Sequence, residues 1–412
     1  MPTSATSQPL RAVKSPIHAL PLEVLGEIFK MLVANGAACR AVTQVCRRWR
    51  MGALGDSNLW REVTVSAKDA YHIPVVEHLL HLSKGRTIAL TLNFHGFEQR
   101  ERDRNALGAL LSVVASHLGR CSDLRVKTDW DAWAMMTALF VEERYEHLVS
   151  LDLKLIHPPH TPTIERLPPF PFPLSQGHRL QRISLRGMST QVHQIFTHLT
   201  DIRIVNDVPC LYFWLRHPAE RLWLETFRVP ASFPHIPRHP SSAKSTLPRR
   251  SPVTHLVLMG LRATRDGPHG DSELSCVPFF EGLRTPCVRV LEIVEWDPCS
   301  RVWGDFLAVL VGSHNKYPLV AHLRLCRMHL VGLSYADTTR FLQALPTLET
   351  MRLERCYQGT WEKVLEVLEM DETLCPGLQE IRLQGEAVLC RNDPLPFRNV
   401  GMPDMREIIL DS

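Results

Sequence analysis

Histidine and cysteine are the residue types in this sequence whose number could supply a metal site or a redox centre. The chain has 20 histidines and 11 cysteines in 412 residues. His78 and His81 are spaced to share one helix face, whereas His157 and His160 lie in a proline-rich stretch. Neither pair has further ligands nearby, and no two cysteines form a C-x-x-C motif. We therefore expect solvated or packed histidines, reduced thiols, no metal site and no cofactor.

The sequence also lacks the short motifs that position nucleophiles, phosphates or catalytic metals. It contains no GxxxxGK loop, no GxGxxG fingerprint, no HExxH helix and no GxSxG elbow. No catalytic or cofactor-binding residue is assigned, and we expect the chain not to be an enzyme. A hydrolase or transferase built on an α/β domain is the alternative that these absences disfavour.

Charge and hydropathy exclude several other classes of protein. The net charge is +4 and the isoelectric point is about 8.5, which is too balanced to indicate nucleic acid or an anionic membrane as the main partner. No apolar run approaches the roughly 18 residues of a membrane-spanning helix. Residues 1–15 are polar and lack the apolar segment of a signal peptide. We expect a disordered tail over 1–15 and a cytoplasmic or nuclear location.

The elements that must carry any function begin with a helical stretch. From residue 17 the chain reads IHALPLEVLGEIFKMLV, with Pro21 at the expected helix start and Asn35-Gly36 at its end. Five apolar residues of this helix share one face: Leu22, Leu25, Ile28, Phe29 and Leu32. A second helix follows, whose apolar face consists of Val42, Val45, Cys46 and Trp49. A turn at 56–58 and an extended segment at 62–65 complete this region.

Three sub-motifs in this order carry a family resemblance. LPLEVLGEIF, VCRRW and NLWREV together resemble the F-box domain, over residues 16–66. The segment 37–41 departs from the family pattern because it is low in leucine. The resemblance implies a small helical unit that docks on a Skp-type adaptor and through it on a cullin ubiquitin ligase. The residues that would lie in or support this interface, some of them as internal core, are Leu20, Pro21, Leu22, Leu25, Ile28, Val45, Trp49 and Trp60.

Docking also has a physical reason that is independent of the family. About fifty residues cannot bury much surface alone. Each apolar side chain removed from water contributes roughly 1.5–3 kcal/mol, so five or six suffice for a tight complex. The alternative is that this segment merely caps the domain that follows it.

After a linker predicted over 67–85, a repeated pattern of two apolar residues separated by one runs from residue 86 to 412. The first residues of the pairs are Leu90, Leu124, Leu151, Ile183, Ile202, Leu222, Leu256, Leu291, Leu323, Met351, Ile381 and Ile408. Nine of the twelve have a large apolar residue three positions earlier, which is the L-x-x-L-x-L pattern of a leucine-rich repeat. The consensus asparagine or cysteine is nearly absent, and only Cys356 fits it.

The pattern predicts an α/β fold: a solenoid with parallel inner strands and outer helices, and at most twelve repeats. Helices are expected over 300–312, 334–345 and 360–370. Proline-rich inserts at 157–173 and 228–252 are expected to be loops. The resemblance is to the irregular leucine-rich repeats that often follow an F-box. A non-solenoid α/β domain is the alternative.

Residues between the two apolar positions are expected to point onto the concave face, because side chains alternate along a strand. Arg324, Arg352 and Arg382 hold this position in three successive repeats, with Glu354 and Glu380 close enough to neutralise them partly. The predicted arginine ladder is a candidate substrate-binding site for an acidic or phosphorylated segment. A self-paired, solvated charge row is the alternative.

Together these features predict a substrate-recognition subunit of a cullin-type ubiquitin ligase, as the F-box resemblance implies. The helices would hold the Skp-type adaptor, and the solenoid would hold an unknown target protein. Nucleic acid and membrane are not expected partners. The alternative is a scaffold that acts outside any ligase complex.

Overall fold

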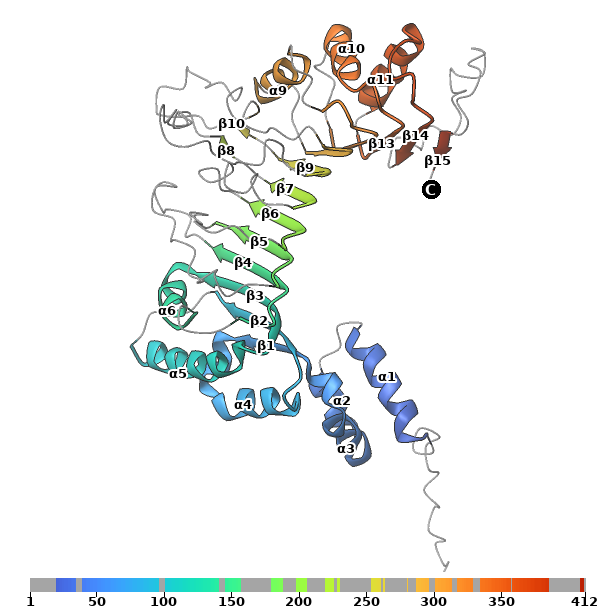
Figure 1. Ribbon diagram of the computed structural model, residues 1–412. Helices are drawn as coiled ribbons and strands as arrows, with labels where there is room; N and C mark the ends of the chain where they lie inside the picture. Colours follow the sequence, from blue (N-terminus) through green and yellow to red (C-terminus); the bar gives the residue numbers. More distant parts are fainter. Residues whose placement is uncertain are drawn as a thin grey trace, which may run out of the picture.

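The chain folds into an N-terminal helical module followed by a long parallel sheet with helices on one face (Figure 1). The structure, a computed structural model, describes residues 20–34, 39–95, 101–140, 145–156, 179–187, 198–205, 219–225, 228–229, 253–260, 262–263, 280, 287–295, 301–312, 317–328, 334–356, 358–384 and 408–410. The predicted tail at 1–15, the insert at 157–173, residues 230–252 and the His157–His160 pair lie outside them. In these ranges no helix is long and apolar enough to cross a bilayer.

The sheet has thirteen strands, and every neighbouring pair is parallel. In spatial order they are β1 (Glu62–Ser66), β2 (Ile88–Phe94), β3 (Cys121–Asp129), β4 (Ser150–Ile156), β5 (Arg182–Arg186), β6 (Asp201–Val205), β7 (Arg221–Glu225), β9 (His255–Met259), β11 (Val290–Val294), β12 (His322–Cys326), β13 (Thr350–Glu354), β14 (Glu380–Gln384) and β15 (Ile408–Leu410). The short strands β8 (Arg228–Val229) and β10 (Arg262–Ala263) pair separately.

The twelve predicted strands all form, and apart from a shift at Ile88–Ala89 between β2 and β3 their register is uniform. The first residue of each apolar pair lies opposite its counterpart on the next strand, from Leu90 in β2 to Ile408 in β15. Val63 of β1 extends the same row. One continuous core therefore runs beneath the sheet, because the apolar pairs of the strands from β1 to β14 point to the same face.

Helices cover that apolar face. They are η3 (Ala67–Tyr71), α4 (Ile73–Leu82), α5 (Glu101–Leu118), α6 (Trp130–Phe140), α9 (Arg301–Val311), α10 (Tyr335–Gln343) and α11 (Gln358–Met370). The three helices predicted in the C-terminal half are confirmed, and Ser334 caps α10 by accepting the Asp337 backbone N–H. In Figure 1 the helices α4–α6 and α9–α11 lie on the outer side of the curved sheet.

Five of the described strands are followed by a residue with a left-handed backbone. Gly187 and Gly260 have φ values of 70° and 58°, and Glu295, Arg327 and Arg355 have values of 56°, 52° and 49°. Each directly follows the last residue of its strand. Cys356, the one residue that fits the repeat consensus, then turns inward, and its thiol donates to the Leu325 carbonyl at 3.4 Å. Burial raises the pKa of this thiol to about 11, so it stays protonated as a donor.

The predicted linker over residues 67–85 is wrong. These residues form η3 and α4, and Val76 and Leu80 of α4 are fully covered within the solenoid core. The extended segment at 62–66, assigned from sequence to the helical region, is the first strand of the sheet. The sequence misled because the repeats were counted only from Leu90, although the apolar residues of β1 and α4 complete the core at its N-terminal end.

The helical module consists of α1 (Leu22–Ala34), α2 (Cys39–Val45), α3 (Arg47–Gly55) and the 3-10 turn η2 (Ser57–Trp60). The single second helix predicted from sequence is wrong, because it is broken at Cys46. The Cys46 backbone is extended, and its sulfur accepts the Trp49 backbone N–H at 3.5 Å as an N-cap. The module has a hydrophobic cluster of its own, which Leu79 and Leu82 of α4 join to the solenoid.

Candidate functional surfaces

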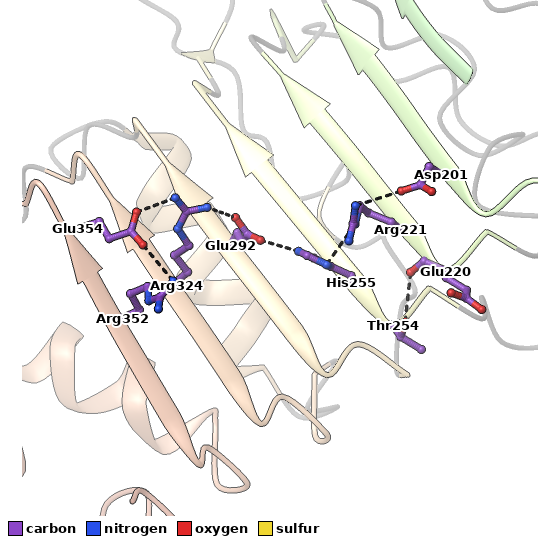
Figure 2. Close-up of polar contacts among 9 residues, drawn as sticks. All are labelled: Asp201, Glu220, Arg221, Thr254, His255, Glu292, Arg324, Arg352 and Glu354. Carbon is purple, nitrogen blue, oxygen red and sulfur yellow. Dashed lines mark hydrogen bonds and ion pairs between the residues drawn. The ribbon is translucent and has the colours of Figure 1, made fainter. Parts of the chain in front are cut away.

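The concave face of the sheet carries a chain of ion pairs and hydrogen bonds that crosses six strands (Figure 2). We call it the ion-pair network; its members are Asp201, Arg221, His255, Glu292, Arg324 and Glu354. All lie on the face opposite the helices, because they alternate with the buried apolar pairs. Acidic and basic side chains alternate along the network except where His255 stands between Glu292 and Arg221.

Arg324 is the most strongly paired cation of this network. Its Nη1 lies 2.7 Å from a Glu292 oxygen and its Nη2 lies 2.6 Å from a Glu354 oxygen. Both carboxylates are mostly covered, and their hydrogen bonds raise the pKa of Arg324 above its ordinary value. The guanidinium therefore acts as a fixed bridge between β11 and β13, with both of its NH₂ groups engaged.

Glu292 is held from two sides. Its Oε1 lies 2.6 Å from His255 Nε2, while its other oxygen accepts from Arg324. The hydrogen bond from His255 lowers the pKa of Glu292 most, and the bond from Arg324 lowers it further, against the opposing effect of burial. Arg221 donates from Nε to His255 Nδ1 at 3.3 Å, so the imidazole is placed with its proton on Nε2. Arg221 in turn lies 3.3 Å from Asp201.

The three arginines predicted as a ladder are in register, with Arg324 opposite Arg352 and Arg352 opposite Arg382. Each contacts a carboxylate: Arg352 lies 3.6 Å from Glu354, and Arg382 donates to Glu380. With Glu292 they line an open depression of about 310 Å³. The structure thus pairs the arginines within the chain, as the alternative reading of the sequence held.

A second group of contacts lies nearer the middle of the sheet. Glu225 of β7 accepts from Arg203 at 3.1 Å and from Arg186 at 3.2 Å. The Arg203 guanidinium also lies over the Trp223 ring, 4.7 Å from its centroid. This group shows how the face is built: cations on one strand are neutralised by a carboxylate one or two strands away.

Sequence reasoning missed Asp201, Arg221, His255 and Glu292. A signal for them was present. Glu292 occupies the same position between the apolar pair as Arg324, and Asp201, Arg221 and His255 stand in one row two residues earlier on adjacent strands. Aligning the repeats by their apolar pairs would have placed these opposite charges side by side.

The predicted histidine pair of α4 does not gather ligands. His78 and His81 are exposed, and the His81 ring meets only the His117 ring, at 6.1 Å between centroids. Burial, followed by the charge of Arg120, lowers the pKa of His117. The part of the chain that the structure describes contains no group of three or more side chains placed to hold a metal ion.

The helical module combines a closed core with exposed apolar side chains. Leu25 and Phe29 are completely buried, and the Phe29 and Trp49 rings lie 5.0 Å apart. Trp60 Nε1 donates to the Ala53 carbonyl at 2.8 Å, which closes α3 against η2. The large apolar side chains that stay exposed on the same module are Leu22, Val24, Met31, Leu32, Val45 and Met51.

Helix geometry explains why some apolar side chains of α1 remain outside the core. Val24, Ile28 and Met31 stand at i, i+4 and i+7, so they form one stripe along α1 beside the buried Leu25 and Phe29. Val45 at the end of α2 and Met51 in the middle of α3 are 59% and 66% exposed. A fragment of this size cannot cover all its apolar surface, and the remainder is available to a partner.

Residues 17–66 match the F-box-like family model. The match coincides with α1, α2, α3, η2 and strand β1, and it indicates no catalytic family. No curated protein matches the chain significantly. Among solved structures, one described as the crystal structure of the Rad7 and Elc1 complex in yeast is 10% identical and has a TM-score of 0.27. That comparison covers 91% of this chain and 96% of the other.

The F-box-like module divides the eight predicted interface residues by burial. Leu25, Trp49 and Trp60 lie in its core, where they support the surface from below. Pro21, Leu22 and Val45 are exposed, whereas Leu20 and Ile28 are half-buried. Arg48 donates to the Leu20 carbonyl and thereby fixes the start of α1 on α3. The surface available for contact therefore consists of Leu22, Val45 and the residues around them, including Val24, Met31 and Met51.

Proposed function

We propose that this protein is the substrate-recognition subunit of a cullin-type ubiquitin ligase. The F-box-like module would bind a Skp-type adaptor through its exposed apolar side chains, and the solenoid would hold a target protein on its concave face. The observation that carries this proposal is the F-box-like match over residues 17–66 on a module that buries its own core and still exposes six large apolar side chains.

The energetics are consistent with docking. Removing one large apolar side chain from water contributes roughly 1.5–3 kcal/mol. Six such side chains, even incompletely covered, offset the loss of translational and rotational freedom on association. If the module only capped the solenoid, its six exposed apolar side chains would be expected to pack against the sheet. Instead, Leu79 and Leu82 of α4 already make the junction with its core.

The protein would perform no chemistry itself. Its contribution would be proximity, because the rigid sheet joins the adaptor-binding end to the target-binding face. The link between them is short: Arg86 donates to Asn58 at 2.6 Å and Lys84 donates to the Gly55 carbonyl at 3.1 Å. These bonds tie the F-box-like module to the first turn of the solenoid and favour a fixed orientation of the two parts.

A calorimetric titration with a purified Skp-type adaptor tests the first step. We expect Met51→Asp to weaken adaptor binding by at least tenfold, on the order of the transfer free energy of one large apolar side chain. Met370→Asp is a matched control, since Met370 on α11 is 71% exposed and Met51 is 66% exposed. Equal binding by the two variants, or no binding by the wild-type chain, would contradict the proposal.

A third variant separates surface from core. Leu25→Ala removes a fully buried side chain, so it should lower both the thermal midpoint and adaptor binding. Met51→Asp should lower adaptor binding and leave the thermal midpoint unchanged. If the wild-type chain binds the adaptor but never a cullin, the scaffold alternative replaces the ligase.

A further inference from the structure

Three cations stand side by side on the concave face near the N-terminal end of the sheet. Lys127 of β3 lies opposite Lys154 of β4, and Lys154 lies opposite Arg186 of β5. We call these three residues the cation row. Neighbouring strands are about 4.8 Å apart, so the row spans roughly 10 Å. Both lysines are half-buried.

The two lysines of the cation row are not neutralised as the arginines of the C-terminal half are. Arg186 contacts Glu225 at 3.2 Å. Within the described ranges, however, no carboxylate lies at ion-pair distance from Lys127 or Lys154, or from the exposed Arg125 beside Lys127 on the same strand. The strands β3–β5 thus present a locally positive face.

The acidic side chains of this region are directed elsewhere. Asp123 lies 4.0 Å from Arg182, and Asp129 accepts the Ala132 backbone N–H at 3.1 Å at the start of α6. Asp152 stands opposite Arg125, but the two side chains are not within ion-pair distance in the structure. Among the described side chains, Arg125, Lys127 and Lys154 therefore have no carboxylate at ion-pair distance.

Adjacent like charges on neighbouring strands destabilise a sheet. Elsewhere on the same face, each NH₂ group of Arg324 contacts a carboxylate. No such carboxylate among the described residues neutralises Lys127 and Lys154. A local feature that opposes stability without compensation is typical of a binding surface. We propose that the concave face of β3–β5 binds an acidic, extended segment of a partner protein, with Arg125, Lys127 and Lys154 as its contacts.

An acidic peptide fits this face better than nucleic acid does. An extended peptide advances about 3.3 Å per residue, so acidic groups two residues apart lie roughly 6.6 Å from each other, which matches the spacing of Arg125 and Lys127 along one strand. Non-specific nucleic-acid binding at physiological salt needs many phosphate contacts, and the described part of this face offers three unpaired cations. If the protein is the ligase subunit proposed above, the acidic peptide would be part of its target protein. Only this assignment of the peptide to a target rests on the proposed function.

Fluorescence anisotropy with the full chain and no adaptor tests the inference. The probe is a labelled peptide of about ten residues that alternates serine and glutamate, in unmodified and phosphoserine forms. We expect Lys127→Glu and Lys154→Glu each to weaken binding by at least about tenfold. Lys68→Glu is the control, because Lys68 is exposed on η3 and makes no ion pair with a described residue. Raising salt from about 0.05 to 0.5 M should weaken binding of the wild-type chain.

Stability separates loss of binding from loss of fold. Lys154→Glu places a carboxylate between Lys127 and Arg186, so its thermal midpoint should stay equal to that of the wild type or rise. Lys154→Gln should weaken binding to a smaller extent with the same midpoint. The inference is overturned if neither peptide binds, if both lysine variants bind like Lys68→Glu, or if a thymidine oligonucleotide of equal length binds more tightly than the peptides. Adaptor binding, measured separately, does not affect this result.

Discussion

Glu292 shows at the residue scale how the concave face is held together. Its carboxylate links His255 on β9 to Arg324 on β12, and Arg324 continues the link to Glu354 on β13. Sequence reasoning recovered the position of Arg324 because side-chain direction on a strand depends only on a period of two. It could not recover the pairing, because Glu292 and Arg324 are 32 residues apart and meet only through the register of two strands.

Replacing this carboxylate should weaken the sheet. We expect Glu292→Gln to lower the free energy of unfolding by about 1–3 kcal/mol, because a mostly covered, hydrogen-bonded charge is lost. Glu349→Gln is the matched control, since Glu349 is exposed and no contact of its side chain is present among the described residues. Equilibrium unfolding in urea measures both. Equal midpoints for the two variants would contradict the role given to Glu292.

The pH dependence of this effect has a definite sign. The pKa of Glu292 is lower in the folded chain than its ordinary value, owing first to His255 and then to Arg324. Its stabilising contribution is therefore complete above the ordinary glutamate pKa of about 4.3 and declines as the pH falls through the lower folded value. The difference in unfolding free energy between wild type and Glu292→Gln should shrink below about pH 4. A difference that grows on acidification would be inconsistent with these contacts.

At the element scale, the repeated strands were predictable and the N-terminal elements were not. Each L-x-L strand carries its own signal, so all twelve strands and three helices could be located from local sequence. The break of the second helix at Cys46 depends on a weak sulfur cap and on packing of Trp49, neither of which alters the helical period. Pro74 and Gly85 are residue types that often mark linkers, whereas Leu80 between them is fully buried.

Substitution within α4 tests its place in the core. Leu80→Ala should cost about 2–5 kcal/mol of unfolding free energy, because Leu80 is completely buried in the solenoid core. Val75→Ala on the same helix should cost less than about 0.5 kcal/mol, because Val75 is 46% exposed. Urea unfolding followed by circular dichroism compares them. If both variants lowered the free energy of unfolding by a similar, small amount, residues 67–85 would have to be assigned as a linker again.

On the scale of the whole molecule, α4 joins two hydrophobic clusters that would otherwise be separate. Its Val76 and Leu80 belong to the solenoid core, and Leu79 and Leu82 pack on the core of the F-box-like module. The sequence indicated both parts and their order. Their junction was missed because one helix contributes residues from two of its faces to the two cores, so no single amphipathic pattern marks it. This junction supports the proposed function, because it fixes the concave face of the sheet relative to the F-box-like module. The module would bind the ligase complex through its exposed apolar side chains.

Co-precipitation from cells treated with a proteasome inhibitor tests the central proposal most directly. It compares the wild-type chain with the double variant Leu22→Asp, Val45→Asp, whose changes lie on exposed positions of α1 and α2. The wild-type chain should recover a Skp-type adaptor together with a cullin. The double variant should lose both and still bind the acidic peptide with unchanged affinity. Recovery of the adaptor and cullin by both chains, or by neither, would contradict the assignment of the F-box-like module as the ligase-binding surface.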